Sequence, residues 1–376
     1  ILVQKIRKQV RIRIIGDYDV DGVTSSHLFL TALRRVGAKV DVVIPHRIQD
    51  GYGLSLHLLQ QAKEDGVDTI LTCDNGIAAI DEIAWAKAQK MTVLVTDHHA
   101  VPFEEHEGRR TEKKSLADAV VNPHQQDCGY PYKELCGAGV AWNVIRVLYE
   151  NYDMDKREAE DLLDFVAMAT VCDVMSLTGE NRILVKEGLK RIRHTKNIGL
   201  QALMQACNVQ PENISAYHFG YVLGPCVNAT GRLDTARHAL RLFETGQETE
   251  AEEIARDLVD LNQERKELTL QGVEMAKKLC EEGGYENDPV LVLFLPDVHE
   301  SIAGLIAGRI REMYNRPVFV LTRGEEGVKG SGRSTENYSM YENMCGCAEL
   351  FTKFGGHPMA AGLSLPEENV EKFRRK

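Results

Sequence analysis

The sequence predicts an α/β protein: a doubly wound parallel sheet, then a long connecting helix and a second, smaller α/β domain. Three observations support this prediction. Short β-branched runs alternate with amphipathic stretches over residues 1–125, a proline-free stretch covers 248–282, and a strand and helix pattern returns after Gly283-Gly284. At about 150 residues per domain, a chain of 376 residues is expected to form two or three domains.

The expected strands of the first domain are short runs rich in β-branched residues. They cover Ile12–Ile15, Val40–Ile44, Thr69–Thr72, Thr92–Thr96 and Ala119–Val121. Between them, the stretches 23–36, 55–65 and 78–89 carry apolar residues three and four positions apart, the spacing of a helix that packs on a sheet. Strands joined by such helices run parallel, which predicts an open, doubly wound sheet.

The middle of the chain is expected to be helical. Residues 137–170 predict two helices, and 181–245 predict further, mainly helical structure. The stretch 248–282 contains a single glycine and predicts one long helix. A strand at 290–295, a helix at 301–313, a strand at 317–321, a glycine-rich turn and a last strand at 361–365 should follow. We therefore expect domains at 1–245 and 285–376, joined by a helix over 246–284.

Composition excludes several classes of protein. Apolar residues make up 43% and charged residues 27% of the chain, and no apolar run approaches the roughly 18 residues that span a bilayer. Nine cysteines without a CxxC pair indicate reduced thiols in the cytoplasm rather than a disulfide framework. A net charge of −11 disfavours binding of nucleic acid by a global positive field and leaves a local basic cleft open. Because the chain opens with Ile1 and ends within an expected helix, we expect the core of a longer protein.

Acidic and histidine residues follow three of the expected strands. The strand ends continue as Gly16-Asp17-Tyr18-Asp19-Val20-Asp21-Gly22, as Cys73-Asp74-Asn75-Gly76 and as Asp97-His98-His99. Ligands of open parallel sheets bind beyond the carboxyl ends of the strands, so these groups are expected to converge on one crevice. Taken singly, an Asp-Gly pair is usually a turn and a histidine pair is often a surface or capping feature. Three such strand ends together favour a metal site.

The residue types predict which metal and which reaction. Several carboxylates cannot all stay ionised side by side unless cations neutralise them. Oxygen ligands with one or two imidazoles suit Mn²⁺ or Mg²⁺ better than a metal that prefers thiolates. Two such ions about 3.5–4 Å apart would clamp the attacking and leaving oxygens of a phosphoryl displacement and generate hydroxide from water. The expected reaction is phosphoester hydrolysis.

These residues resemble the DHH phosphoesterases, and within that superfamily they are most similar to the RecJ single-strand-specific DNA exonucleases. The stretch Gly16–Gly22 and the triplet Asp97-His98-His99 carry the resemblance. Further motifs occur in the family's order over nearly the whole chain: Asp50-Gly51-Tyr52-Gly53-Leu54, Leu135–Ala141, Cys172-Asp173-Val174, Asn228-Ala229-Thr230-Gly231-Arg232-Leu233, Ser331-Gly332-Arg333-Ser334 and Phe354–Gly362.

The resemblance implies roles for matching residues. One metal would be held by Asp17 and Asp74, and the other by Asp19, Asp74, His98 and Asp173. His99 would lie against the scissile phosphate, Asp97 would support the histidines from behind, and Asp21 would shape the turn. Some DHH phosphatases have a histidine four residues before the first aspartate, where this chain has Arg13. The first metal is therefore expected to have fewer protein ligands, and single occupancy is anticipated.

Residues 290–376 resemble the family's second domain, of the DHHA1 type, which would bind substrate. Gly355-Gly356-His357 predicts either a loop that lets backbone N–H groups approach a phosphate or a tight turn with a buried histidine. Arg333 is expected either to contact a phosphate or to be a hairpin arginine in solvent. The expected substrate-binding residues are Asn228, Arg232, His299, Arg309, Ser331, Arg333, Gly355, Gly356 and His357. With only 6% aromatic residues, contacts to the DNA backbone should dominate over base stacking.

The expected function is metal-dependent hydrolysis of single-stranded DNA to mononucleotides, with the strand in a cleft between the domains. The resemblance implies 5′ to 3′ polarity and a role in DNA repair and recombination. Expected partners are single-stranded DNA and a single-strand-binding protein or helicase, with no membrane and a monomeric state. Two alternatives remain: a DHH phosphodiesterase for short oligonucleotides or cyclic dinucleotides, and a non-catalytic protein that binds DNA or a replication partner. The 181–245 segment and the long connecting helix argue against the first, and the nearly complete ligand set argues against the second.

Overall fold

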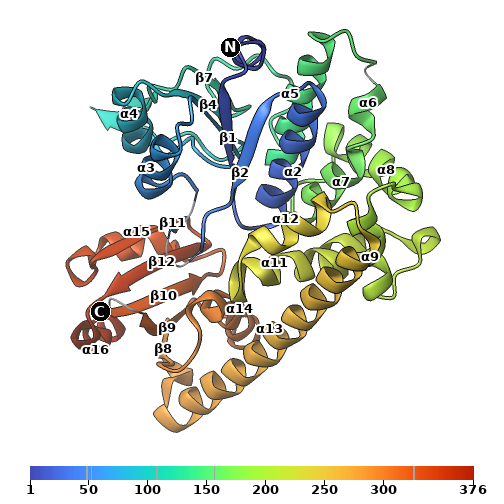
Figure 1. The fold of residues 1–376 in the computed structure, drawn as a ribbon. Coiled ribbons are helices and arrows are strands. Elements are labelled where there is room, and N and C mark those ends of the chain that lie inside the picture. Colours follow the sequence, from blue (N-terminus) through green and yellow to red (C-terminus); the bar gives the residue numbers. More distant parts are fainter. Residues whose placement is uncertain (48–49, 52, 107–108, 156, 325–326) are drawn as a thin grey trace. The chain divides into compact units, whose positions relative to one another are not determined.

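The computed structural model describes residues 1–47, 50–51, 53–106, 109–155, 157–324 and 327–376. They divide into two compact units, Ile1–Asn262 and Gln263–Lys376. The boundary between the units lies within the long helix α13 (Glu248–Gly283), which Figure 1 shows in yellow to orange. The motif residue Tyr52 lies outside the described residues.

The first unit contains the expected parallel sheet. Its strands are β1 (Arg11–Ile15), β2 (Lys39–Val43), β3 (Thr69–Cys73), β4 (Thr92–Thr96) and β7 (Ala119–Val121), in the order β2-β1-β3-β4-β7. Every pairing between neighbours is parallel. The chain leaves β1 for β2 on one side and then crosses to β3 on the other, so the order reverses between β1 and β3. Ligands of such sheets bind at this reversal point.

Helices cover both faces of this sheet (Figure 1). Alternate strand residues point to opposite faces: Ile12 and Ile14 share a core with α2, α5 and α7, and Ile15 packs with α3 and α4. The helices are α1 (Leu2–Arg7), α2 (Val20–Arg35), α3 (Leu56–Glu64), α4 (Ile80–Ala88), α5 (Gly137–Glu150), α6 (Arg157–Glu160), α7 (Leu163–Cys172), α8 (Gly179–Arg191), α9 (Ile198–Ala206), α10 (Ala216–His218), α11 (Gly224–Leu233) and α12 (Ala236–Glu244). A hairpin of β5 (Phe103–His106) and β6 (Arg109–Glu112), which the sequence pattern did not predict, precedes β7.

The second unit is built on a mixed sheet. Its strands are β8 (Leu291–Phe294), β9 (Val318–Gly324), β10 (Gly327–Arg333), β11 (Lys353–Gly356) and β12 (Ala360–Leu365), in the order β11-β12-β10-β9-β8. Only β8 and β9 pair in parallel among these strands. Helix α14 (Ala303–Tyr314) packs on one face with the end of α13, and α15 (Met340–Cys345) and α16 (Val370–Arg375) pack on the other.

Two strands of the second sheet were not expected from the sequence. β10 contains glycines at 327, 330 and 332, and β11 ends in Gly355-Gly356. Glycine weakens a strand because it brings no side chain to pack. Here the neighbours compensate, because β10 pairs along its whole length with β9 and from Val328 to Arg333 with β12. Tertiary pairing therefore overrides the local propensity.

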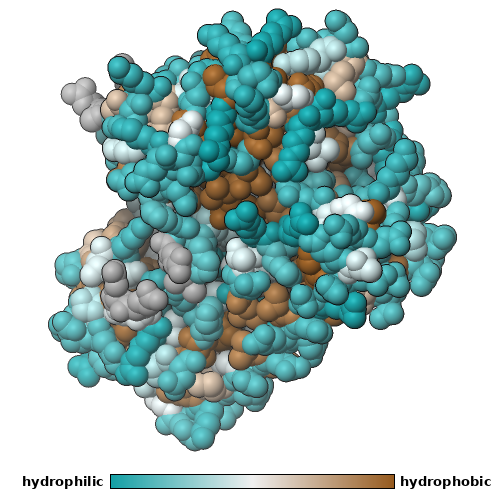
Figure 2. All heavy atoms as spheres, viewed as in Figure 1, coloured by the Kyte–Doolittle hydropathy of each residue, from teal (hydrophilic) through white to brown (hydrophobic). Residues whose placement is uncertain are grey.

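The doubly wound sheet, the long helix and the smaller second α/β unit confirm the predicted fold class. Figure 2 shows mostly hydrophilic side chains on the face in view, with separate apolar patches between them. Among the residues that the structure describes, no helix is both long and apolar enough to cross a membrane.

Candidate metal centre and substrate-binding residues

Acidic residues follow three neighbouring strands of the first unit and lie close together at one edge of the sheet. Asp17 follows β1, Asp74 follows β3, and the triplet beginning at Asp97 follows β4. Asp19 is the N-cap of α2, and its side chain accepts a hydrogen bond of 3.0 Å from the Gly22 backbone N–H. The cap fixes the turn between β1 and α2, because it satisfies a backbone donor that the helix leaves open.

The ligand-type atoms of these residues lie close enough together to hold metal ions. Three groups each have their atoms within 4.8 Å of one another: Asp17, Asp19 and Asp74; Asp74, His98 and His99; and Asp21, His98 and Asp173. His98 Nε2 lies 3.1 Å from Asp74 Oδ1, 3.6 Å from Asp173 Oδ2 and 3.7 Å from Asp21 Oδ2. The structure thus brings together all six residues that the sequence singled out as catalytic.

Asp21 belongs to this cluster, although the sequence assigned it only to the turn. Its carboxylate is buried and accepts hydrogen bonds from the backbone N–H groups of Gly137, at 2.6 Å, and Ala138, at 2.7 Å. These donors form the N-terminus of α5, where the helix dipole favours a negative charge. Asp21 therefore anchors α5 beside His98. Its partners lie more than a hundred positions away in the sequence, so no local pattern could identify them.

Asp97 holds His99 in place. Asp97 Oδ1 lies 2.8 Å from His99 Nδ1 and also accepts the backbone N–H of His98 at 2.7 Å, while Oδ2 accepts the backbone N–H of Ile77 at 2.9 Å. Burial opposes the charge on both side chains, but their contact outweighs it, lowering the pKa of Asp97 and raising the pKa of His99 to about 9. At neutral pH, His99 is therefore a cation beside the carboxylates. The ring of His98 makes no such contact with Asp97 and faces the cluster.

Burial raises the pKa of several clustered carboxyl groups, and their neighbours' charges add to the effect. The pKa of Asp17, of Asp19 and of Asp74 is raised, in each case chiefly by burial and then by adjacent aspartates. For Asp173 the same causes raise the pKa to about 8. Among the described residues, the buried atom Asp17 Oδ1 receives no hydrogen bond. A divalent cation would favour the ionised carboxylates, and oxygen ligands with one imidazole suit Mn²⁺ or Mg²⁺.

Two residues of the cluster region have left-handed backbone. Asp74 has φ of 62° and Val174, directly after Asp173, has φ of 58°. A β-branched residue rarely adopts this conformation, and Val174 is also 88% exposed. Such strain tends to persist at functional sites. The exposed apolar side chain of Val174 therefore lies directly after the expected metal ligand Asp173.

Close packing around the cluster explains two of the glycines in the motifs. A Cβ at Gly137 would lie 2.7 Å from the Cβ of Asp74, so a larger residue would separate α5 from the cluster. A Cβ at Gly231 would lie 2.4 Å from the carbonyl oxygen of Tyr18, so α11 can meet the turn after β1 only through glycine.

Arg13 does not take part in the cluster. Its guanidinium is buried and forms ion pairs with Asp41 (Nε to Oδ1, 2.7 Å) on β2 and with Asp65 (Nη1 to Oδ2, 2.8 Å) after α3. These contacts hold its side chain against the neighbouring strand. The group of Asp17, Asp19 and Asp74 accordingly consists of carboxylates alone.

A cation that the sequence did not single out lies beside the first aspartate. The guanidinium carbon of Arg47 is 4.6 Å from the centre of the Tyr18 ring, and its charge works against burial in setting the pKa of Asp17. The charge of Arg232 reaches the same Tyr18 side chain. Asn228 Oδ1 accepts the backbone N–H of Val20 at 3.1 Å, so it fixes the first turn of α2.

In the second unit, the expected substrate residues have different surroundings. Arg333, on β10, donates to the carbonyl oxygen of Gly332 at 2.7 Å and lies against Gly304 in the first turn of α14. It is half-buried, as is Ser331 on the same strand. His299 caps a short 3₁₀ turn, with Nδ1 2.6 Å from Ser301 Oγ. The side chain of Arg309 is 67% exposed and pairs with Glu312 at 3.5 Å.

The stretch Gly355-Gly356-His357 is not the loop expected from the sequence. Gly355 and Gly356 are the last residues of β11 and pair with Gly362 and Ala361 of β12. His357 then turns the chain: its backbone N–H donates to the carbonyl oxygen of Ala360 at 2.8 Å, and its side chain is exposed. The alternative of a buried histidine is therefore wrong.

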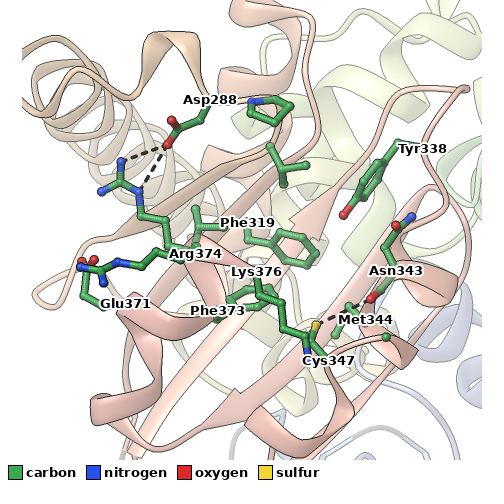
Figure 3. A pocket seen from close by; sticks show the side chains of 15 residues that line it. Asp288, Phe319, Tyr338, Asn343, Met344, Cys347, Glu371, Phe373, Arg374 and Lys376 are labelled. Carbon is green, nitrogen blue, oxygen red and sulfur yellow. Dashed lines mark hydrogen bonds and ion pairs between the residues drawn. The ribbon is translucent and has the colours of Figure 1, made fainter.

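A cavity of about 750 Å³ lies elsewhere in the second unit. Figure 3 shows its lining, which includes Tyr338, Cys347 and Arg374 with the ion pair between Arg374 and Asp288. The seven second-unit residues expected to contact substrate are absent from this lining, as far as the described chain shows. The cavity is therefore separate from the site built above.

Comparison with known proteins agrees with this geometry. Residues 11–170 match the DHH family, N-terminal domain, and residues 287–376 match the DHHA1 domain. The chain is 38% identical to the single-stranded-DNA-specific exonuclease RecJ of Haemophilus influenzae, covering 100% of this chain and 66% of that protein. It is 37% identical to the RecJ of Salmonella typhimurium, covering 67% of that protein. This chain belongs to the RecJ family.

Solved RecJ structures share the fold. The crystal structure of exonuclease RecJ bound to manganese has a TM-score of 0.85 and 32% identity, covering all of this chain and 90% of the other. RecJ from Thermus thermophilus in complex with Mn²⁺ has a TM-score of 0.84 and 31% identity, covering 52% of that chain. The chain spans about two thirds of the Haemophilus RecJ, at 66%. Both the resemblance to RecJ and the predicted fold class are thereby confirmed.

Proposed function

We propose that this chain hydrolyses single-stranded DNA from the 5′ end to mononucleotides. The observation that carries the proposal is the convergence of buried ligand atoms at the carboxyl ends of β1, β3 and β4, with His98 Nε2 facing three carboxylates at 3.1 to 3.7 Å. The names of relatives at 37 and 38% identity, single-stranded-DNA-specific exonucleases, supply the substrate class.

The metal ligands in this proposal are Asp17, Asp19, Asp74, His98 and Asp173. Solved RecJ structures that hold Mn²⁺ or Mg²⁺ support either ion. When bound, such ions lower the pKa of water and stabilise charge on phosphate oxygens. The protein holds the five ligand groups in place through two contacts: Asp19 caps α2, and Asp21 anchors the N-terminus of α5. Asp21 neutralises the first turn of α5 and keeps that helix beside the cluster.

His99 completes the reaction site as a positioned cation. Held by Asp97, its protonated ring can donate a charge-assisted hydrogen bond to a non-bridging phosphate oxygen. Arg47 and Arg232 lie around Tyr18, at the edge of the cluster, and are suited to the next phosphate groups. These contacts are to the DNA backbone, so the binding would be independent of sequence.

We assign catalysis to residues 1–245 and substrate binding to residues 285–376. In the second part, Arg333 lies at the first turn of α14, where a guanidinium and helix N–H groups can share an anion. Ser331 on the same strand and the backbone of Gly355, Gly356 and His357 are proposed to contact neighbouring phosphates. His299 and Arg309 are proposed at the margin of the same surface. Asn228 is proposed to act near the cleaved bond by fixing the start of α2.

In the cell, we propose a cytoplasmic monomer that acts in DNA repair and recombination. The absence of CxxC pairs among nine cysteines supports the compartment. Single-strand-binding protein or a helicase is the proposed partner, because either would present the single strand that the enzyme degrades.

The direct test is digestion of a fluorescent single-stranded DNA labelled in turn at each end, with Mn²⁺, Mg²⁺ or chelator. The proposal expects metal-dependent, stepwise loss from the 5′ end. Stepwise loss from the 3′ end would overturn the polarity. Turnover of dinucleotides or cyclic dinucleotides without cleavage of the strand would replace the exonuclease with a phosphodiesterase, and binding without any cleavage would leave a non-catalytic protein.

A further inference from the structure

Two tyrosines in the first unit lie stacked in solvent. Tyr217 is 62% exposed and Tyr221 is 72% exposed, and their ring centres are 5.1 Å apart with 25° between the planes. On the other side of the same segment, Phe219 and Leu223 are fully buried. The tyrosines therefore do not serve the core, although aromatic rings usually contribute most when they are buried. An aromatic pair held in solvent is suited to a flat ligand.

The tyrosines begin a stripe along one continuous helical segment. The segment consists of α10, a π-helix at Phe219–Leu223 and α11. Its exposed and half-buried residues include 217, 221, 225, 228 and 232, which are three or four positions apart and therefore share one face. The far end of the stripe is Asn228 and Arg232, beside the turn between β1 and α2. One helix face thus joins the aromatic pair to the metal cluster.

A second contact places the tyrosines near the cluster. Cys172 Sγ donates to the carbonyl oxygen of Phe219 at 3.3 Å, so the π-helix packs against the end of α7, one residue before Asp173. From Tyr221 to Asn228 the helix advances about 10 Å. A stacked strand covers that length with about three nucleotides at ~3.4 Å each.

The charge of this segment suits a polyanion. The chain has 56 acidic residues and a net charge of −11, but residues 216–233 contain no aspartate or glutamate and one arginine. A nucleic-acid strand is the occupant that fits both the aromatic pair and the missing acids, because a base stacks on a ring and its phosphate avoids carboxylates.

We propose that Tyr217 and Tyr221 form a base-stacking platform for single-stranded DNA, a few nucleotides from the bond that is cut. The proposal rests on the proposed function and adds a contact to the bases. Stacking on aromatic side chains is tolerant of sequence because every base has a flat face. The platform therefore lengthens the binding site without making it sequence-specific. It also adds base stacking to the contacts with the DNA backbone that the sequence led us to expect as the dominant ones.

The test compares alanine and phenylalanine at both positions. The double variant Tyr217→Ala/Tyr221→Ala should weaken binding of a fluorescent twelve-nucleotide strand by about ten-fold or more, and Tyr217→Phe/Tyr221→Phe should bind as the wild type does. Binding is measured by anisotropy with chelator present, so the result does not depend on cleavage. Phe103→Ala, a change at another exposed aromatic residue in the first unit, is the matched control and should have no effect.

A strand with abasic sites in place of the stacked bases gives a second readout. The wild type should lose affinity for that strand, and the double alanine variant should bind it as weakly as it binds the normal strand. Three results would each overturn the platform. The double alanine variant could bind the normal strand as the wild type does, the double phenylalanine variant could lose as much affinity as the alanine variant, or the wild type could bind no strand at all. A wild type that binds through the tyrosines and never cleaves would overturn the proposed function alone.

Discussion

In the first unit, acidic side chains that follow three neighbouring strands meet in one buried cluster, whereas in the second unit the expected substrate residues are spread over β10, β11, α14 and two turns. The cluster residues contact one another at 3.1 to 3.7 Å. In the second unit, Arg309 faces solvent, His299 caps a turn, and Arg333 lies on a helix terminus. Buried charges need a neutralising partner within the protein because they have lost their contact with water. Exposed charges are solvated by water and need a partner only when substrate binds.

The difference has an energetic consequence. Clustered, buried carboxylates destabilise the metal-free fold, since burial and mutual repulsion raise the pKa of Asp17, Asp74 and Asp173. A bound cation should reverse this effect. The residues of the second unit carry no such strain, so their removal should change substrate binding and leave stability alone. Four experiments test the contrast between the two units.

The largest effect is expected at Asp74, which belongs to two of the three ligand groups. Asp74→Asn should lower kcat with Mn²⁺ on the order of 10³-fold, ~4 kcal/mol, because it removes a shared ligand of the metals. The same change should raise the Tm of the metal-free protein, since one buried carboxylate of the cluster is gone. Thermal unfolding with and without Mn²⁺ and a kinetic assay measure both.

Asp127→Asn is the control, because that side chain is 78% exposed in the same unit. It should change neither quantity. The account is wrong if Asp74→Asn keeps wild-type activity, or if Mn²⁺ still raises its Tm as much as it raises that of the wild type.

The second prediction concerns the second unit. Arg333→Ala should lower kcat/KM for single-stranded DNA by about 10- to 100-fold, the loss of hydrogen bonds to a charged phosphate. Arg333→Lys should restore little of it, because an ammonium cannot form the paired contacts of a guanidinium. Arg309→Ala should be near wild type. In all three variants, the Mn²⁺-induced rise in Tm should be intact, and its loss would show that the two units are not separable in this way.

The third prediction compares glycines. Gly137→Ala should reduce the free energy of unfolding by about 1–3 kcal/mol, because the new methyl group would meet Asp74 at 2.7 Å. It should also weaken Mn²⁺ binding by displacing that carboxylate. Gly129→Ala, where no atom lies within 4 Å of the added Cβ, is the matched change and should be tolerated. Denaturant unfolding and a Mn²⁺ titration of both variants decide the point, and equal stabilities would contradict it.

The smallest effect involves a buried histidine outside the cluster. His27 on α2 packs against Phe165 and Phe243, and burial lowers its pKa from 6.5 to about 3. Below pH 6.5, His27 binds a proton in the unfolded chain but stays neutral in the folded chain. The free energy of unfolding therefore falls as the pH drops, by ~1.4 kcal/mol per pH unit. Above about pH 7 the histidine is largely neutral in both states and contributes almost no pH dependence.

Replacing the ring should remove this sensitivity. Between pH 6.5 and 5, the free energy of unfolding of the wild type should fall by about 2 kcal/mol relative to that of His27→Phe, and the difference should be constant above pH 7. Urea unfolding at several pH values measures it. Parallel profiles for the two proteins would show that His27 is not held neutral.

Much of the first unit could be predicted because its signals are local. Each strand of its parallel sheet is a short run rich in β-branched residues, and the metal-type residues follow three of these strands in the sequence, so Asp17, Asp74 and His98 could be placed at one sheet edge. The anchoring of α5 by Asp21 and the position of Arg47 beside Tyr18 depend on contacts between distant segments. No spacing in the chain indicates them.

The second unit shows the opposite case. Its glycine-rich strands β10 and β11 have poor strand propensity, and pairing with β12 decides their structure. The stretch Gly355-Gly356-His357 consequently looks like a loop in the sequence and is a strand end followed by a turn in the structure. The exposure of Tyr217 and Tyr221 also could not be predicted from the sequence, because the aromatic content does not indicate which rings face solvent.

Anomalous diffraction from crystals grown with Mn²⁺ would locate the metal ions in the first unit. The account predicts one or two strong peaks among the carboxylates of Asp17, Asp19, Asp74 and Asp173 and the Nε2 atom of His98, at coordination distance from these atoms. A peak held by other residues, or none in this cluster under saturating Mn²⁺, would contradict the metal centre and the hydrolysis built on it.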